Sequence, residues 1–140
     1  SLSPENPTRL TKIFNLLNGR ANVFRRGCNL ITSFPAASEE DILRVHKPEY
    51  LDFISNYSRG GGGFLGDSTY LNQHSYELAL LAAGAAMSAG ERVLDGSANF
   101  AVSLMRPPGH HATSEKYGGY CIFNNVVFPH RRGPIMRPLF

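Results

Sequence analysis

The most constraining feature of this sequence is a long, nearly apolar helical segment that is followed at once by a short apolar run. Residues 75–94 place alanine and leucine around most of the circumference that they would present as a helix, and Ser75 is the expected N-cap. After a turn at 95–99, residues 100–105 (FAVSLM) are continuously apolar, which is typical of a buried strand in a parallel sheet. Together they predict an α/β fold, with the helix packed against the sheet.

In such a fold, ligands bind beyond the carboxyl ends of the strands, so chemistry is expected just after Met105. The chain continues there with residues 106–112 (RPPGHHA) and, after a polar loop, with residues 118–125 (GGYCIFNN). Two prolines restrict the backbone, and we expect Gly109 to adopt a conformation barred to other residues. Two adjacent imidazoles, which suit proton transfer near neutral pH, would then lie at a pocket rim. A histidine pair in a loop is more often a solvated or capping feature, so the pair alone leaves the function open.

The other predicted elements alternate around this segment. In chain order they are a helix at 7–18, a β-prone run at 29–34, a short helix through Val45, a helix that begins at Pro48 and a glycine-rich loop at 59–64. A capping box of Ser38 and Asp41 supports the short helix. The helix after Pro48 is expected to turn a core face inward, made of Tyr50, Leu51, Phe53, Ile54 and Tyr57.

Charge and cysteine content exclude several classes of protein. The net charge of +3 is localised, because Arg131, Arg132 and Arg137 lie in a final segment without an acidic residue. The body of the chain therefore has no electrostatic support for a nucleic-acid groove, and a short basic tail is usually only a solvated end. Cys28 and Cys121 stand far apart, so neither a disulfide framework nor a cysteine zinc knuckle is indicated.

The sequence shows neither a signal peptide nor a transmembrane segment. Its most apolar stretch, residues 76–89, is shorter than a membrane span and is interrupted by Glu77, Gly84 and Ser88. We therefore expect a soluble, intracellular protein in the cytoplasm or nucleus, with no membrane partner.

The motifs RPPGHHA and GGYCIFNN together closely resemble the signature of the histone deacetylase superfamily, which includes acetylpolyamine amidohydrolases and acetoin-utilisation proteins. Three further stretches agree with that family in the expected order: PENPTRL near the start, PAASEEDILRVHKPEYLDFI, and DSTYLNQHSYELALLAAGAA before the apolar run. The match covers about residues 4–126 and is most similar to the class II and prokaryotic members. Chance agreement of so many ordered segments is improbable.

The resemblance implies the arginase-like three-layer α/β/α fold with a parallel sheet, present here in truncated form. It also implies a reaction in which zinc-bound water attacks the carbonyl of an acetyl-lysine or of another acetylated amine. His110 and His111 match the tandem histidines beside the metal-bound water, one acting as general base and the other as acid or electrostatic partner. Gly119 matches a backbone carbonyl that holds the substrate amide.

The resemblance assigns the remaining pocket residues less directly. Tyr120 stands where the family usually has a phenylalanine that lines the acyl-lysine tunnel, so the aromatic wall is kept and a hydroxyl is added. Asp67 is a possible rim residue near the substrate. Cys121 matches a pocket-side cysteine, although the better interpretation is a small buried hydrophobic residue. His46 is expected to be structural in a helix connection, and His74 to be exposed before a helix.

The resemblance ends at about Val126. The family continues to an Asp-x-His pair that binds zinc with a later Asp, whereas residues 127–140 form a basic, proline-rich tail without any acidic residue. We therefore expect residues 1–126 to be the N-terminal part of a deacetylase domain, the tail to be disordered or artefactual, and no zinc to bind this chain. The functional hypotheses are a deacetylase fragment that is inactive alone or, as the alternative, a catalytically inactive module that binds acyl-lysine or regulates.

Overall fold

The computed structural model describes residues 3–19 and 23–128, and the chain divides into two compact units, residues 1–34 and 35–140. The first unit contains helix α1 (Thr8–Asn18) and the short 3-10 helix η1 (Val23–Arg26), and the rings of Phe14 and Phe24 lie 6.3 Å apart within it. The helix predicted at 7–18 is confirmed. The β-prone run at 29–34 forms no strand, because no other strand in the described residues pairs with it.

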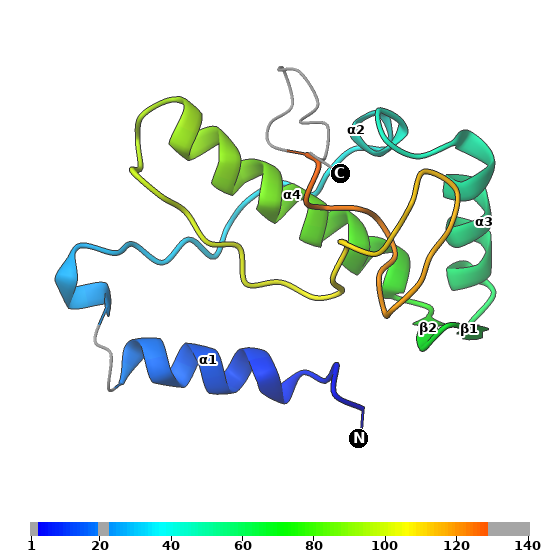
Figure 1. The fold of residues 1–140 in the computed structure, drawn as a ribbon, viewed down its shortest axis with the longest axis horizontal. Coiled ribbons are helices and arrows are strands. Elements are labelled where there is room, and N and C mark those ends of the chain that lie inside the picture. Colours follow the sequence, from blue (N-terminus) through cyan, green and yellow to red (C-terminus); the bar gives the residue numbers. More distant parts are fainter. Residues whose placement is uncertain (1–2, 20–22, 129–140) are drawn as a thin grey trace. The chain divides into compact units, whose positions relative to one another are not determined.

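The second unit contains helices α2 (Glu39–Leu43), α3 (Pro48–Arg59) and α4 (Ser75–Leu94), and strands β1 (Gly62–Gly66) and β2 (Thr69–Asn72). Figure 1 shows α4 as its longest element, with α3 and the hairpin at the end where α4 begins. The predicted capping box at the start of α2 is confirmed, and so is Pro48 in the first turn of α3. The N-cap of α4 is His74, one residue before the predicted Ser75.

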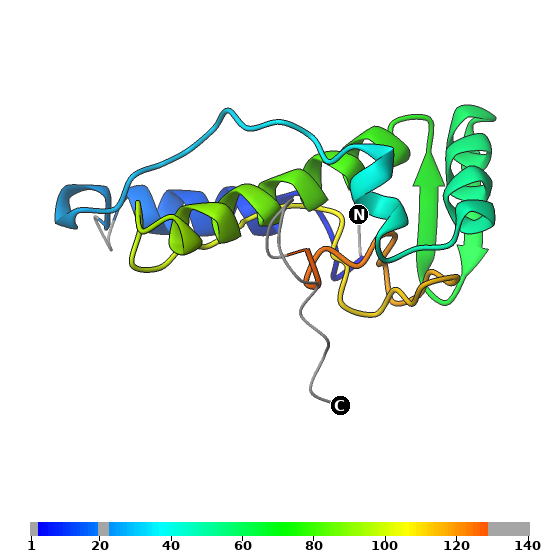
Figure 2. The same ribbon diagram turned by 90° about the horizontal axis from the view of Figure 1, so that it is seen from above.

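The glycine-rich segment that was predicted to be a loop belongs in part to a β-hairpin. Strands β1 and β2 are antiparallel, with Gly62 opposite Asn72, and Figure 2 shows the hairpin beside α3. A Cβ on Gly62 would lie only 2.2 Å from the carbonyl oxygen of Leu71, so glycine allows this pairing by lacking a side chain. The prediction of a loop is wrong in this part because it rests on the backbone entropy of glycine. It does not include the close approach of the partner strand, which requires glycine at position 62.

Helix α4 packs closely on the segment that precedes α2. A Cβ on Gly84 would lie 2.2 Å from the carbonyl oxygen of Pro35, and the backbone N–H of Ala37 donates to the carbonyl of Leu80 at 2.9 Å. The small residues of α4 thus allow this close approach, although the partner of the helix is a backbone segment and not the sheet that the sequence predicts. The buried core comprises Ala37, Ile42, Tyr50, Leu51, Ile54, Leu71, Tyr76, Ala79, Ala83, Met87, Ile122, Phe123 and Phe128.

The strand predicted at 100–105 is not formed. Figures 1 and 2 show this segment, in yellow, running extended alongside α4, and its apolar side chains are largely exposed: Phe100 is 69% exposed and Val102 is 72% exposed. An extended chain becomes a strand only when a neighbour pairs with its backbone N–H and C=O groups. Within the described residues, β1 and β2 make the only sheet, so the predicted parallel sheet does not form here.

The tail predicted to begin at residue 127 is described only in its first two residues, Val127 and Phe128, and both are buried. Residues 129–140 lie outside the described part of the chain. Within the described ranges, no helix has the length and the apolarity needed to cross a bilayer.

Candidate functional site

The two histidines of RPPGHHA lie side by side on the surface of the second unit. Both side chains are exposed, and the ring centroids of His110 and His111 are 4.2 Å apart with an interplanar angle of 50°. Neighbouring imidazoles that are open to solvent can exchange protons with a molecule bound above them. The structure thus leaves both predicted histidines next to each other and accessible to solvent.

Gly109 is required at this loop for space and not for an unusual backbone angle. It is absent from the residues with positive φ, so the predicted conformation barred to other residues is wrong. A Cβ at this position would instead lie 2.3 Å from the carbonyl oxygen of Phe123 and 2.3 Å from Oδ1 of Asn125. The backbone before His110 therefore packs directly on residues 123–125, the FNN segment. Only a residue without a side chain allows this contact.

Two asparagines hold the segment 106–112 from the other side. Nδ2 of Asn124 donates to the carbonyl of Ala112 at 2.8 Å, and Nδ2 of Asn125 donates to the carbonyl of Pro107 at 3.4 Å. These bonds attach both ends of RPPGHHA to the FNN segment. The sequence indicates Asn124 and Asn125 only as part of a motif. The signal that points to their role is two adjacent amide side chains after a buried aromatic residue.

The GGYC segment forms a tight turn against His111. Gly118 and Cys121 pair across it, and the two residues between them have positive φ, 52° for Gly119 and 69° for Tyr120, as in a type I′ turn. A left-handed backbone costs a residue with a side chain about 1–2 kcal/mol, and such strain often occurs at functional sites. A Cβ on Gly119 would lie 2.6 Å from the ring of His111, so the turn and the imidazole are in direct contact.

Asp67 joins the hairpin tip to this turn. It lies between β1 and β2 with a φ of 45°, and its carbonyl accepts a hydrogen bond from the N–H of Gly119 at 3.0 Å. A Cβ on Gly118 would lie 2.4 Å from the Asp67 carboxylate, so that carboxylate lies over the turn. The structure therefore gathers Asp67, Gly119, Tyr120 and the histidine pair into one region, although they come from two distant parts of the sequence.

Cys121 lies beneath the turn and is fully buried. Its Sγ accepts from the backbone N–H of His111 at 3.4 Å and donates to the carbonyl of Gly119 at 3.5 Å. Burial raises the pKa of the thiol, and a thiol that stays protonated is a poor nucleophile. This placement supports the interpretation of Cys121 as a small buried residue.

The other histidines differ from the pair in their surroundings. His46 lies between α2 and α3, is 2% exposed, and has its ring 5.3 Å from the rings of both Tyr50 and Phe123. Burial lowers its pKa to about 4. The predicted structural position of His46 in a helix connection is thus confirmed. His74 is exposed at the start of α4, as predicted.

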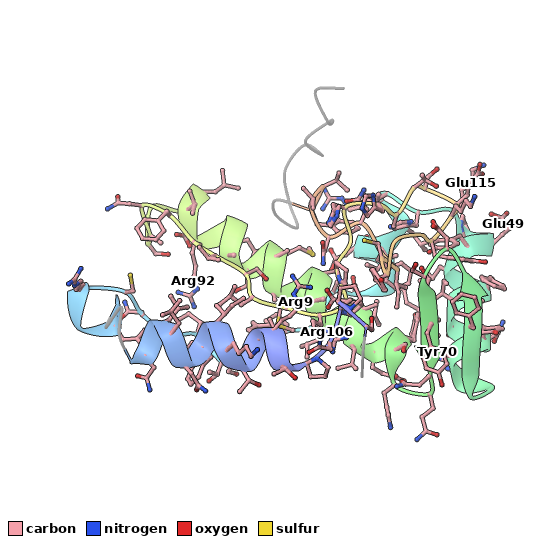
Figure 3. The ribbon with its side chains drawn as sticks, turned by 60° about the horizontal axis from the view of Figure 1, so that its bottom comes forward. Arg9, Glu49, Tyr70, Arg92, Arg106 and Glu115 are labelled. Atoms are coloured by element: carbon pink, nitrogen blue, oxygen red, sulfur yellow. The ribbon has the colours of Figure 1, made fainter. Side chains whose placement is uncertain are left out.

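Two cavities lie near these residues. An apolar groove of about 740 Å³ runs between α4 and the extended segment, and His110 contributes to its lining. The lining residues are Ala86, Ala89, Gly90, Val93, Leu94, Ala101, Ser103, Met105, Pro108, Gly109, His110, Asn125, Val126 and Phe128. A smaller one of about 400 Å³ is lined by residues that include Glu49 and Glu115, which Figure 3 shows at the same end of the second unit. There Lys47 forms an ion pair with Glu115.

The described residues do not fit a zinc site. Across residues 3–19 and 23–128, no three side chains of the metal-binding types histidine, cysteine, aspartate and glutamate come together. A protein zinc site needs at least three such ligands. In the described part of the chain, His110 and His111 have no third side chain of these types grouped with them.

Comparison with known proteins identifies the family. Residues 3–129 match the histone deacetylase domain. A histone deacetylase-like amidohydrolase of Pseudomonas aeruginosa is 41% identical over 125 residues, which are 89% of this chain and 31% of that protein. Histone deacetylase HDA1 of Saccharomyces cerevisiae is 37% identical over 140 residues, covering 89% of this chain and 20% of that protein. Polyamine deacetylase HDAC10 of Homo sapiens is 35% identical over 131 residues, covering 88% of this chain and 19% of that protein.

The structural comparison agrees. The crystal structure of the HDA15 HD domain matches with a TM-score of 0.82 and 31% identity, covering 90% of this chain and 36% of that one. The predicted deacetylase-type α/β fold, present as a part of the domain, is thereby confirmed. The chain spans about a third or less of the length of the relatives compared above. The chain belongs to the histone deacetylase family of hydrolases.

Proposed function

We propose that this chain supplies the proton-transfer pair and part of the substrate pocket of a deacetylase that hydrolyses the amide of an acetylated amine. The observation that carries the proposal is the exposed, adjacent pair His110 and His111, held against the turn that contains Gly119. Relatives named as histone deacetylases and as polyamine deacetylases support the substrate class. That class is an acetylated primary amine, either on a lysine side chain or on a polyamine.

The proposed roles follow from what amide hydrolysis requires. One imidazole takes a proton from the attacking water, and the other gives a proton to the nitrogen of the leaving amine or stabilises charge beside it. Rings with centroids 4.2 Å apart can both reach one bound amide. Because an unactivated amine is a poor leaving group, loss of either proton transfer should slow turnover strongly.

The neighbouring residues are proposed to hold the substrate. The carbonyl of Gly119 would accept the substrate amide N–H, and the ring of Tyr120 would form a wall for the acyl-lysine chain. Asp67 would accept hydrogen bonds from the substrate backbone at the rim, since its carboxylate lies over the same turn. Each of these roles uses a group that the fold already brings within one region of the second unit.

The metal-binding groups of the domain are proposed to come from outside the described residues, because these gather no zinc site and residues 126–140 contain no acidic side chain. The 140-residue chain alone is therefore expected neither to retain zinc nor to deacetylate. Zinc content after dialysis, measured against a His110→Ala/His111→Ala control, and turnover of an acetyl-lysine peptide test this expectation. Stoichiometric zinc together with turnover would show that it is wrong.

A chimeric enzyme tests the function itself. Residues 3–129 would replace the matching segment of the Pseudomonas aeruginosa relative, so that the rest of that protein completes the domain. We expect the chimera to deacetylate an acetyl-lysine peptide or acetylpolyamine, and to lose this activity on substitution of either histidine. A folded chimera that contains zinc and is inactive would contradict the proposed function.

The alternative is a module that binds acyl-lysine without hydrolysing it. It is favoured by one observation, the lack of a zinc-ligand group among the described residues. Titration of the chain alone with an acetyl-lysine peptide, followed by NMR at His111 and Gly119, distinguishes the two. Saturable binding without turnover, combined with an inactive chimera, would favour the alternative.

A further inference from the structure

A third histidine, His46, is connected to the loop that carries the exposed pair. It lies 64 residues before His110 in the sequence, in the connection between α2 and α3, and it is buried. Its Nε2 accepts a hydrogen bond from the backbone N–H of Asn124 at 2.9 Å. The ring therefore reaches the FNN segment directly.

Asn124 links His46 to the histidine pair through two hydrogen bonds. Its backbone N–H donates to the ring of His46, and its side chain donates to the carbonyl of Ala112 at 2.8 Å. Ala112 is the residue after His111. The next residue of the same connection, Lys47, donates its backbone N–H to the carbonyl of Ser114 at 2.8 Å. The connection between α2 and α3 thus holds the loop at two points just after the pair.

The protonation state of His46 fixes the direction of these bonds. Burial lowers its pKa to about 4, while the backbone of Ser114 and Thr113 acts more weakly in the opposite direction, so the ring is neutral near pH 7. Because Nε2 accepts from Asn124, the single ring proton is on Nδ1. A protonated ring would have no acceptor for the Asn124 N–H.

The ring carries a cost that an apolar side chain would not. Nδ1 is buried, and the backbone of Ser114 and Thr113 raises the pKa of the ring through weak hydrogen bonds, neither of which reaches normal hydrogen-bond geometry at Nδ1 among the described residues. A buried donor with only weak hydrogen bonds is destabilising, whereas an apolar residue of similar shape can fill the space without that penalty. What the imidazole adds at this place is therefore the acceptor that holds Asn124.

We propose that His46 is a positioning residue: its neutral imidazole fixes Asn124 and, through Asn124, the loop that presents His110 and His111. The effect of His46 on catalysis rests on the proposed function, whereas its effect on the position of the loop does not. The position of the loop can therefore be tested on the full chain without any assay of activity.

Cys121 provides the reporter for that test. Its thiol is fully buried and accepts from the N–H of His111, so movement of the loop would expose it. Cys28 is the other cysteine of the chain, and Cys28→Ser removes it from the measurement. The rate of reaction of the Cys121 thiol with a disulfide reagent under native conditions then measures opening of the loop.

The test compares three variants in the Cys28→Ser background. His46→Leu removes the acceptor, and His46→Gln keeps an acceptor oxygen near the position of Nε2. Ser58→Ala is the matched control, because it removes a buried hydroxyl that bonds to the carbonyl of Asn72 and the N–H of Tyr76, away from the loop. The unfolding free energy of each variant, from urea titration, corrects the rates for global unfolding.

We expect His46→Leu to raise the corrected rate of Cys121 modification at least about tenfold over Ser58→Ala, and His46→Gln to stay within about threefold of the parent. Asn124→Ala should open the loop as much as His46→Leu, and the double variant should open it no further, because both act through one chain of bonds. If His46→Leu does not fold, the corrected rates of Cys121 modification in His46→Gln and Asn124→Ala still test the proposal. Equal rates for His46→Leu and Ser58→Ala, or additive effects in the double variant, would overturn the proposal.

The chimera separates this proposal from the proposed function. In it, His46→Leu should lower kcat and leave KM nearly unchanged, with recovery in His46→Gln. If His46→Leu exposes Cys121 but kcat stays at the parent value, while His110→Ala abolishes activity, the catalytic part of the positioning proposal is wrong. If His110→Ala and His111→Ala also leave kcat unchanged, it is the proposed function that has failed.

Discussion

The second unit has a closed half and an open half. In the closed half, which comprises residues 35–87 and 106–128, side chains such as Ile42, Ile54 and Phe123 are almost completely buried. In the open half, residues 88–105, the apolar side chains of Leu94, Phe100 and Val102 are between 64% and 72% exposed. The histidine pair lies at the junction, since His110 also lines the groove of the open half.

The difference shows which structures a chain of this kind completes by itself. Helices, a hairpin and a held loop satisfy their backbone hydrogen bonds with groups that are close in sequence or already buried together. A parallel strand has no such local solution, because its neighbours arrive by crossover connections. The geometry of the histidine loop is therefore set by the closed half, whereas residues 100–105 remain extended and exposed.

The largest effect is expected on catalysis in the chimera. Replacing His110 or His111 by Ala should lower kcat on the order of 100-fold or more, because a positioned proton-transfer group is lost. Zinc content should stay nearly the same, and Ser58→Ala serves as the control. If either substitution removed the zinc while the fold stayed intact, the histidines would be ligands and their assigned role would be wrong.

A core substitution tests the closed half directly. Ile54→Ala removes three carbon atoms from a completely buried side chain in α3 and should lower the unfolding free energy by about 3 kcal/mol, through lost burial and a cavity. The exposed partner in the open half is Val102→Ala, which should change it by less than about 0.5 kcal/mol. Urea denaturation of the full chain measures both. Similar losses at the two sites would remove the distinction between the halves.

Stability should also depend on the protonation of His46. Its pKa is lowered from 6.5 to about 4, so the unfolded chain binds this proton first as the pH falls. The contribution is fully present above pH 6.5 and is lost on approach to pH 4, by on the order of 2 kcal/mol. The measurement is the difference in unfolding free energy between the parent and His46→Gln, which has no titrating ring. A difference that is flat across this range would show that the ring titrates normally.

The smallest effect on stability is expected in the open half. Phe100→Ser with Val102→Ser should leave the unfolding free energy within about 0.5 kcal/mol, because both side chains are already mostly exposed. Binding of a hydrophobic dye and self-association, measured by fluorescence and by sedimentation, should both fall, since exposed apolar patches promote association. A large loss of stability would show that these side chains are packed in solution.

The sequence predicted well those features whose causes are local. The capping box at Ser38, the proline in the first turn of α3 and the long helix from residue 75 were all found, because each depends on residues within a few positions. The histidine pair and Gly119 were found through motifs. Asp67 was named from the resemblance, but its contact with the Gly118–Gly119 turn needed the fold, because 51 residues separate Asp67 from Gly118.

The remaining features were decided by tertiary structure. Residues 100–105 are apolar enough for a strand, yet whether they form one depends on a partner that the segment itself does not specify. Glycine at 62 and at 109 is needed because another backbone approaches within about 2.3 Å of where a Cβ would lie, and no local pattern reports such an approach. The sequence by itself determined the family, the helices and the chemical groups of the site. Only the fold brought His46 to Asn124, because a hydrogen bond across 78 residues depends on how the whole core packs.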